Sequence, residues 1–212
     1  MDNLSIYKTI TNISEIELIE KKSKFIGRCF PLSTENEALT ILDRIRKENW
    51  NATHNCFAYI LRSGEARYSD DGEPSGTAGM PIIETMKHMG ITNALVIVTR
   101  FFGGILLGTG GLVRAYSKSA AEAITAASIK IMIPCVEYSI NVPYSYWNIT
   151  KKMCEKFGRI EKTEFSEFVN CLLWVKDTEA DSFIREITDK TEGRIIPVEK
   201  QYDWFPFPES EA

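Results

Sequence analysis

The stretch NALVIVTRFFGGILLGTGGLVRAY, residues 93–116, contains three kinds of local sequence in succession. The residues before Arg100 are apolar on both faces of an extended chain, which predicts a buried central strand. A glycine-rich turn follows it. From Val113 onward the apolar residues recur at helical spacing, which predicts a long amphipathic helix. The positions expected to face inward are Val113, Tyr116, Ala120, Ala123, Ile124 and Ala127. A buried strand joined to a helix by a tight turn predicts a mixed α+β domain.

Strands and shorter helices are predicted on both sides of this stretch. Residues 16–30 give two strands around a lysine-rich turn, and residues 54–62 alternate as another strand. A capping box beginning at Thr34 starts one helix. A second, short helix is expected from Pro81 to Gly90, since proline suits a first helical turn and glycine a helix end. These elements complete a first domain over residues 1–134.

The remaining residues predict a second domain with a different order of elements. Strand and helix patterns alternate as βαββαβ over residues 135–205, which is the order of a ferredoxin-like domain. The predicted boundary therefore lies near Pro134. Residues 206–212 are rich in proline and acid and are expected to form an acidic tail, disordered at its very end.

Composition indicates an ordinary globular protein. Apolar residues make up 44% of the chain and charged residues 25%. No apolar run approaches the roughly 20 residues of a membrane span, and the N-terminus does not read as a signal peptide. Five cysteines are scattered without a CxxC pair, which argues against a disulfide framework and against a zinc site. The expectation is a cytoplasmic protein with reduced thiols in its core, no metal, no cofactor and no membrane contact.

Charge is distributed unevenly along the chain. Residues 1–134 carry 15 Lys and Arg against 14 Asp and Glu, whereas residues 135–212 carry 10 against 15. No acid occurs between Glu84 and Glu122, a window that contains Lys87, Arg100, Arg114 and Lys118. A locally positive surface on an acidic protein suits a phosphate-bearing or acidic partner, although scattered solvated charges would give the same count.

The glycine-rich turn has two interpretations. A strand, glycines and a helix N-terminus are the components of an anion-binding cradle. The spacing is neither GxGxxG with a downstream acid nor a P-loop, so those nucleotide-binding folds are not expected. Tight turning and close packing alone would also explain glycines at these positions. The glycines concerned are Gly103, Gly104, Gly108, Gly110 and Gly111.

A second loop, DDGEPSGTAGMP at residues 70–81, is rich in acids, glycine and proline. The carboxylates of Asp70, Asp71 and Glu73 could hold a divalent cation, but the EF-hand pattern is absent. Their commoner role is to accept hydrogen bonds from nearby backbone N–H groups and to pair with arginines. Pairing with Arg100 or Arg114 is therefore preferred to metal binding. The other positions of interest in this loop are Pro74, Gly76, which gives backbone freedom, and Thr77, a possible cap of the following helix.

Further candidates come from His54 and the aromatic residues. His54 and Cys56 share one strand face, but no third group orients them as in a catalytic triad, so a structural histidine is preferred. Phe101 and Phe102 could stack on nucleic-acid bases, yet strand aromatics are more often core residues.

Three motifs together resemble the Impact/YigZ family: ATHNCFAY, DDGEPSGTAGMP and TRFFGGILLGTGGLVRAY. The family's motif positions fall here on His54, residues 70–81, residues 100–104, Gly108, Gly110, Gly111, Arg114 and Tyr116. The resemblance implies a first domain similar to ribosomal protein S5 domain 2 and elongation factor G domain IV. It implies a second domain similar to elongation factor G domain V. The family often has Tyr where this chain has Phe101 or Phe102, and the lost hydroxyl weakens a catalytic role there.

These observations lead to a hypothesis of a non-enzymatic protein that binds RNA, the ribosome or a translation-associated protein. Arg100, Arg114 and Lys118 would contact phosphate or acidic groups. A hydrolase or phosphate-handling enzyme that uses the three acids, His54 and Arg100 is one alternative. A regulatory protein–protein interaction module is the other.

Overall fold

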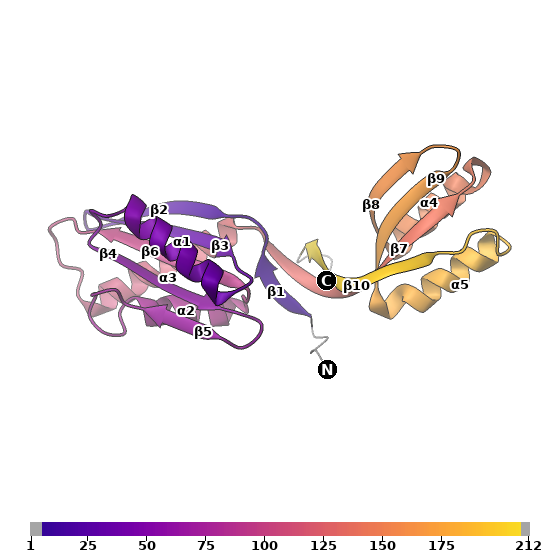
Figure 1. The fold of residues 1–212 in the computed structure, drawn as a ribbon. Coiled ribbons are helices and arrows are strands. Elements are labelled where there is room, and N and C mark those ends of the chain that lie inside the picture. Colours follow the sequence, from indigo (N-terminus) through magenta and orange to yellow (C-terminus); the bar gives the residue numbers. More distant parts are fainter. Residues whose placement is uncertain (1–5, 209–212) are drawn as a thin grey trace. The chain divides into compact units, whose positions relative to one another are not determined.

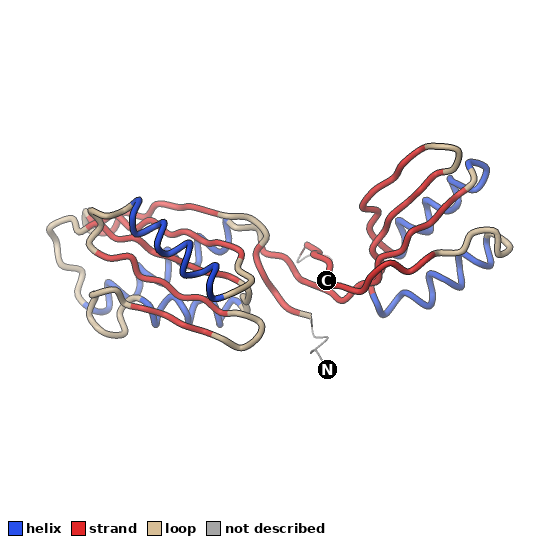
Figure 2. The backbone as a smooth tube through the Cα atoms, in the orientation of Figure 1, coloured by secondary structure: helices blue, strands red, loops and turns tan. Residues whose placement is uncertain are grey.

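In a computed structural model, which describes residues 6–208, the chain is a mixed α+β protein with two compact units, residues 7–131 and 132–207. The elements are β1 (Tyr7–Ile10), β2 (Ser14–Glu20), β3 (Ser23–Pro31), α1 (Glu35–Glu48), β4 (His54–Ile60), β5 (Ala66–Ser69), α2 (Gly79–Met89), β6 (Ala94–Phe101), α3 (Thr109–Ala126), β7 (Ile129–Val142), α4 (Tyr144–Phe157), β8 (Gly158–Phe165), β9 (Val169–Lys176), a 3₁₀ turn (Asp177–Glu179), α5 (Ala180–Lys190) and β10 (Val198–Pro208). Figures 1 and 2 show the arrangement of the elements within each unit.

The first unit is built on a five-stranded antiparallel sheet in the order β2-β3-β6-β4-β5. Strand β6 lies in the middle and is buried on both faces, as the apolar run predicts. Helix α1 covers one face of the sheet, and α2 and α3 cover the other (Figure 1). The site described below lies on the α2–α3 side.

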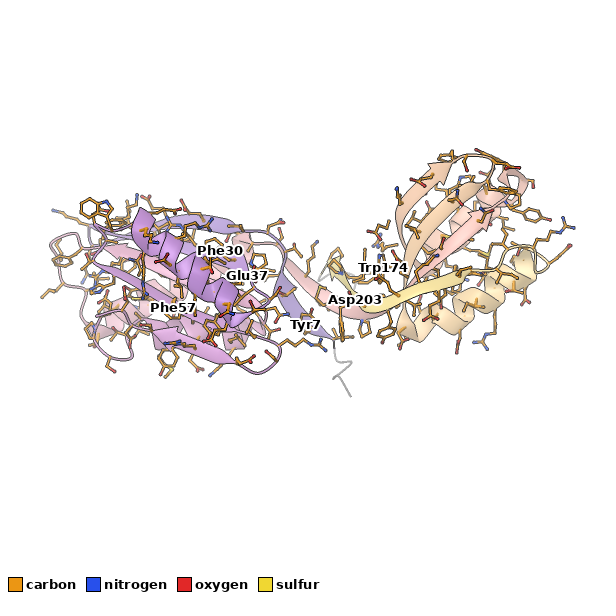
Figure 3. All side chains as sticks on the ribbon, in the orientation of Figure 1. Tyr7, Phe30, Glu37, Phe57, Trp174 and Asp203 are labelled. Atoms are coloured by element: carbon orange, nitrogen blue, oxygen red, sulfur yellow. The ribbon has the colours of Figure 1, made fainter. Side chains whose placement is uncertain are left out.

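Strand β4 is more deeply buried than its alternating sequence suggests. Phe57 and Tyr59 pack with Phe30 in the core under α1, and Figure 3 shows Phe30 and Phe57 beside that helix. Cys56 and Ala58 pack on the opposite face in the core under α2 and α3. Alternation normally indicates one wet face, but here helices on both sides exclude water from both.

Two predicted turn and cap features are confirmed. Lys21 and Lys22 form the turn between β2 and β3, both with positive φ, the conformation of the tight turns that suit twisted hairpins. Thr34 accepts a hydrogen bond from the backbone N–H of Glu37, whose carboxylate reaches back to the N–H of Ser33.

The second unit has the element order β7-α4-β8-β9-α5-β10. Its strands lie in the order β10-β7-β9-β8. Helices α4 and α5 share one core with the sheet, which includes Tyr138 and Phe183. Because β7 begins at Ile129, this strand runs through the boundary expected near Pro134. Residues 206–208, expected to belong to the acidic tail, are the end of β10, and residues 209–212 lie outside the described chain.

All five cysteines are free and buried, in agreement with the expected reduced thiols. Between residues 6 and 208, no helix is both long and apolar enough to cross a membrane.

Candidate functional site

The acidic loop is held by its own carboxylates. Asp70 Oδ1 accepts hydrogen bonds from the backbone N–H groups of Ala78 and Gly79, at 3.0 and 2.8 Å, and Oδ2 accepts one from Gly76 at 2.8 Å. Helix α2 has Ala78 at its N-cap and no local side-chain cap. Asp70 therefore satisfies the orphan N–H groups of this helix from eight residues upstream.

Thr77 does not cap α2, contrary to prediction. Its hydroxyl donates to the carbonyl of Pro74 at 2.6 Å, inside the loop. The prediction is wrong because a long-range carboxylate, Asp70, already occupies the position that a local hydroxyl would fill.

Asp71 links the loop to the sheet and to α1. Its Oδ2 accepts from the backbone N–H of Asn55 at 2.7 Å, and its Oδ1 from the Arg46 guanidinium at 3.1 Å. The residue has a φ of 43°, a left-handed conformation that aspartate tolerates better than most residues. Its backbone carbonyl lies 2.8 Å from Nδ1 of His54. Since a carbonyl only accepts, Nδ1 carries the hydrogen, which fixes the ring orientation.

Glu73 and Arg100 form a buried ion pair, which is one of the pairings between the three acids and Arg100 or Arg114 that the sequence left open. Arg100 Nη1 lies 2.6 Å from Glu73 Oε1, with side chains 6% and 2% exposed. The Tyr116 hydroxyl donates to the same oxygen at 2.7 Å. His54 Nε2 lies 3.8 Å from it. This cluster joins the acidic loop, β6, α3 and β4 in the interior of the first unit.

The three acids of the loop therefore point to different partners rather than to one shared point. Within residues 6–208, no group of three His, Cys, Asp or Glu side chains is arranged to hold a metal ion. Asp70 accepts hydrogen bonds from backbone amides of its own loop, and Asp71 accepts them from β4 and from α1. Glu73 forms an ion pair with Arg100. Local bonding and arginine pairing, the preferred interpretation of the sequence, describe this loop.

Cys56 is not arranged as a nucleophile. Its thiol donates to the carbonyl of Asp70 at 3.0 Å and lies 3.4 Å from the Tyr116 hydroxyl. Burial raises the pKa of this thiol to about 12, and the nearby carboxylates contribute to the rise. The reactive form of a cysteine is the thiolate, so an activated Cys56–His54 pair is not what the geometry provides.

The glycine-rich loop lies against the turn between β2 and β3. A Cβ atom on Gly103 would overlap the Lys22 carbonyl, so only glycine permits this approach. The N–H of Gly103 donates to Ser23 Oγ at 3.2 Å. Phe101 is half-buried, while Phe102 is 46% exposed with the Arg100 guanidinium 5.5 Å from its ring centre. The loop thus brings β6, α3 and the β2–β3 turn together.

A cavity of about 420 Å³ lies between the two loops. The acidic loop contributes Glu73 and Pro74 to its lining. The other lining residues are Thr53, His54, Arg100, Phe102, Leu106, Leu107, Gly108, Thr109 and Leu112. The sequence prediction that the two loops face a shared cleft is therefore supported. Leu106, which is 82% exposed, was missed as a lining residue; its signal is an apolar side chain in an otherwise glycine-rich turn.

A different surface carries the exposed basic residues. Lys21, Arg114 and Lys118, together with one acid, Glu20, border one hollow of about 220 Å³ beside α3. The three basic residues are exposed, and Arg114 has no ion pair within the described residues, whereas Lys118 lies 3.9 Å from Glu122. Arg100 does not join this surface, because it is 5% exposed and paired internally. Arg100 therefore does not share one exposed surface with Arg114 and Lys118, contrary to the prediction.

The remaining predicted glycines occupy distinct places. Gly104 is exposed, with φ of 82° and open space on the side where another residue would carry its Cβ. Gly110 and Gly111 lie in the first turn of α3. A Cβ on Gly111 would lie 3.0 Å from Leu107 Cβ, so Gly111 serves close packing. Gly76 borders a larger groove of about 840 Å³ between α2 and α3, together with Met80, Arg114 and Lys118.

Known proteins resemble this chain over most of its length. Residues 21–124 match the Impact N-terminal domain family. IMPACT family member YvyE of Bacillus subtilis is 35% identical over 201 residues, which cover 90% of this chain and 89% of that protein. IMPACT family member YigZ of Escherichia coli is 29% identical, covering 88% and 92%. A crystal structure of an hypothetical protein aligns with a TM-score of 0.59 and 25% identity, over 92% of this chain and 98% of that one. The chain, with its acidic and glycine-rich loops and its two α+β units, belongs to the IMPACT family.

Proposed function

We propose that this protein binds RNA, in particular ribosomal RNA, through the exposed basic surface of α3, and that it has no catalytic role. The observation that carries the proposal is the meeting of Lys21, Arg114 and Lys118 around one hollow. These residues come from two separate elements, the β2–β3 turn and α3. Clustered lysines and arginines are the electrostatic footprint of a phosphate-binding surface.

The folds of the two units support the same proposal by analogy. We propose that residues 7–131 form a domain similar to ribosomal protein S5 domain 2 and elongation factor G domain IV. The strand order β10-β7-β9-β8, with two helices, supports a ferredoxin-like second unit similar to elongation factor G domain V. Because fold alone does not imply function, the basic surface carries the argument.

The test is co-sedimentation of the full chain with purified ribosomes at increasing salt. The variant Arg114→Ala/Lys118→Ala should bind more weakly and reduce the log–log salt slope by about 2, because two phosphate contacts are lost. Lys151→Ala/Lys152→Ala, two exposed lysines on α4, is the control with the same change in net charge. Equal binding by the first variant and the wild type, or no binding at low salt, would reject the proposal.

A protein partner is the second candidate, favoured by the groove of about 840 Å³ between α2 and α3. Met80, Pro81 and Val113 are apolar residues of its lining, which also includes Glu84, Arg114 and Lys118. A translation-associated protein with apolar and acidic groups would fit such a lining. Ribosome co-sedimentation that survives nuclease treatment would favour this candidate over RNA.

The hydrolase alternative has weaker support from the same residues. Asp70, Asp71 and Glu73 each hold part of the fold, and burial raises the pKa of Cys56. A substrate screen with and without Mg²⁺ remains its direct test, with Asp71→Asn as the variant that must lose activity.

A further inference from the structure

The cavity between the two loops combines a polar floor with an apolar wall. His54, Glu73 and Arg100 form the floor, and Phe102 and Leu106 contribute to the wall. At about 420 Å³ the cavity lies within the range of small-molecule sites. It is separate from the exposed basic hollow beside α3, whose lining shares only Leu107 with it.

Helix α3 begins at this cavity without a side-chain cap. Its N-cap residue is Gly108, with φ of 71° and ψ of 165°, a conformation that only glycine adopts readily. The first turn contains Gly110 and Gly111 and no acidic residue. A helix N-terminus with bare N–H groups carries a partial positive charge. Gly108 and Thr109 both line the cavity, so this charge lies at its wall.

Arg100 provides an independent indication of a ligand at the same place. Its side chain is 6% exposed and lines the cavity floor. Nη1 donates to Glu73 and Nη2 to Ser23 Oγ at 3.4 Å, but the buried Nε has no hydrogen-bond partner among the described residues. Buried donors are nearly always paired, and a charged one that is not requires an explanation. Arg100, with one donor left unpaired, is therefore the group of this lining most in need of an acceptor.

The rim of the cavity is apolar and exposed. Leu106 is 82% exposed and Phe102 is 46% exposed, and both line the cavity. Exposed large apolar side chains in the lining of a cavity are typical of a binding site.

We propose that this cavity binds a small organic oxyanion, a carboxylate or phosphate monoester that carries an apolar group. The oxyanion lies at the N-terminus of α3 beside His54 and Arg100, and the apolar group lies against Phe102 and Leu106. The charge of Glu73 does not oppose this, because Arg100 at 2.6 Å offsets it and Tyr116 donates to the same oxygen. The partial positive charge of the helix N-terminus therefore favours a ligand whose head group is negatively charged.

The test is a titration of the ¹⁵N-labelled full chain with phenyl phosphate and with benzoate, followed by amide chemical shifts. Phenol and inorganic phosphate are the controls, because phenol has the apolar ring without the oxyanion and inorganic phosphate has the oxyanion without the ring. The shifts are expected at residues 102–112 and at His54. Either oxyanion should bind at least about tenfold more tightly than both controls, from the added ring burial and helix-terminal contact. Phenyl phosphate binding above benzoate assigns a phosphate ligand, and the reverse assigns a carboxylate.

Two pairs of variants locate the site. Thr109→Asp places a carboxylate in the first turn of α3, which suits the helix but repels the oxyanion, while Thr125→Asp, at an exposed position in the last turn of the same helix, is its control with the same change in charge. Leu106→Ser removes the apolar contact, while Ile105→Ser, at a 42% exposed position outside the cavity lining, is its control. Binding should fall about tenfold or more in Thr109→Asp and severalfold in Leu106→Ser, and stay unchanged in both controls. Unchanged binding in Thr109→Asp, shifts centred on Lys21 and Arg114, or no response to either oxyanion would overturn the proposal.

Discussion

The acidic loop, residues 70–79, and the glycine-rich loop, residues 102–111, form opposite sides of one cavity but are built in opposite ways. In the acidic loop the side chains are committed to the fold: Asp70 holds three backbone amides, and Glu73 is paired with Arg100. In the glycine-rich loop the helix N-terminus has no side-chain cap, and Leu106 is exposed.

On this difference we base the proposal that the acidic loop maintains the structure and that the glycine-rich loop contacts the ligand. Polar groups that are already paired have little left to offer a ligand, whereas bare N–H groups and exposed apolar side chains have much. The acidic residues are the most conspicuous candidates for a binding site in the sequence, but their carboxylates stabilise the fold. Substitutions in the acidic loop should therefore lower the stability of the fold, and substitutions of exposed residues in the glycine-rich loop should weaken ligand binding.

The largest expected effect is the loss of the buried ion pair. Glu73→Ala leaves the Arg100 guanidinium buried without its carboxylate, so the opening free energy of the β6 amides should fall by about 3–5 kcal/mol. Native-state hydrogen exchange measures this quantity. Glu84→Ala, which removes an exposed carboxylate paired with Lys87 on α2, should change it by no more than about 0.5 kcal/mol. Similar effects of the two variants would contradict a structural role of the acidic loop.

A smaller effect is expected from two neighbouring leucines in the glycine-rich loop. Leu107 is 8% exposed and belongs to the core under α2 and α3, so Leu107→Ala should lower the opening free energy by about 2–4 kcal/mol. Leu106→Ala, at an 82% exposed position, should change it by less than about 0.5 kcal/mol. A large stability loss in Leu106→Ala would show that this residue serves the fold rather than the cavity.

A further, smaller effect is expected at the long-range cap of α2. Asp70→Asn keeps one acceptor oxygen but loses the charge, so the three backbone hydrogen bonds weaken and the opening free energy should fall by about 1–2 kcal/mol. Amides at the start of α2 should exchange faster. The control is Asp43→Asn on α1, an exposed carboxylate paired with Lys47, for which no measurable change is expected. Unaltered exchange in Asp70→Asn would mean that the cap contributes nothing.

The smallest expected effect on stability comes from Cys56, whose thiol should also react slowly in the native chain. Burial raises the pKa of its thiol to about 12, so it stays protonated at about pH 8–9, where an exposed thiol begins to ionise. The stability from keeping this thiol neutral is present below its unfolded pKa and is lost as the pH rises toward 12. Iodoacetamide at about pH 8.5 should label Cys56 far more slowly in the native chain than in urea, measured by peptide mass mapping. Rapid native labelling would contradict the inert role assigned to this residue.

Much of the fold could be predicted from local sequence patterns. The central strand β6, the lysine turn after β2 and the end of α2 at Gly90 each follow from a few adjacent residues. The double burial of β4 could not be predicted this way, because it depends on helices packing from both sides. The cap of α2 was also missed, since Asp70 is too distant in sequence for capping rules that consider neighbouring residues.

The candidate site was only partly predictable for the same reason. The pairing of Glu73 with Arg100 was expected because an acid-rich loop and an arginine at a strand end can meet. Whether that arginine is exposed depends on the packing of Phe25 and Phe102 beside its guanidinium, which no local pattern reveals. Arg114 and Lys118 were placed correctly on the exposed side of α3, because helical periodicity alone determines that face.

The central claim is that the α3 side binds RNA while the acidic loop remains framework. Hydrogen–deuterium exchange of the full chain, with and without ribosomal RNA at low salt, tests it most directly. The account predicts new protection around residues 20–22 and 109–118 and no change at residues 70–79, with the gain abolished in Arg114→Ala/Lys118→Ala. Protection confined to the acidic loop or to α4 and α5, or no protection anywhere, would contradict it.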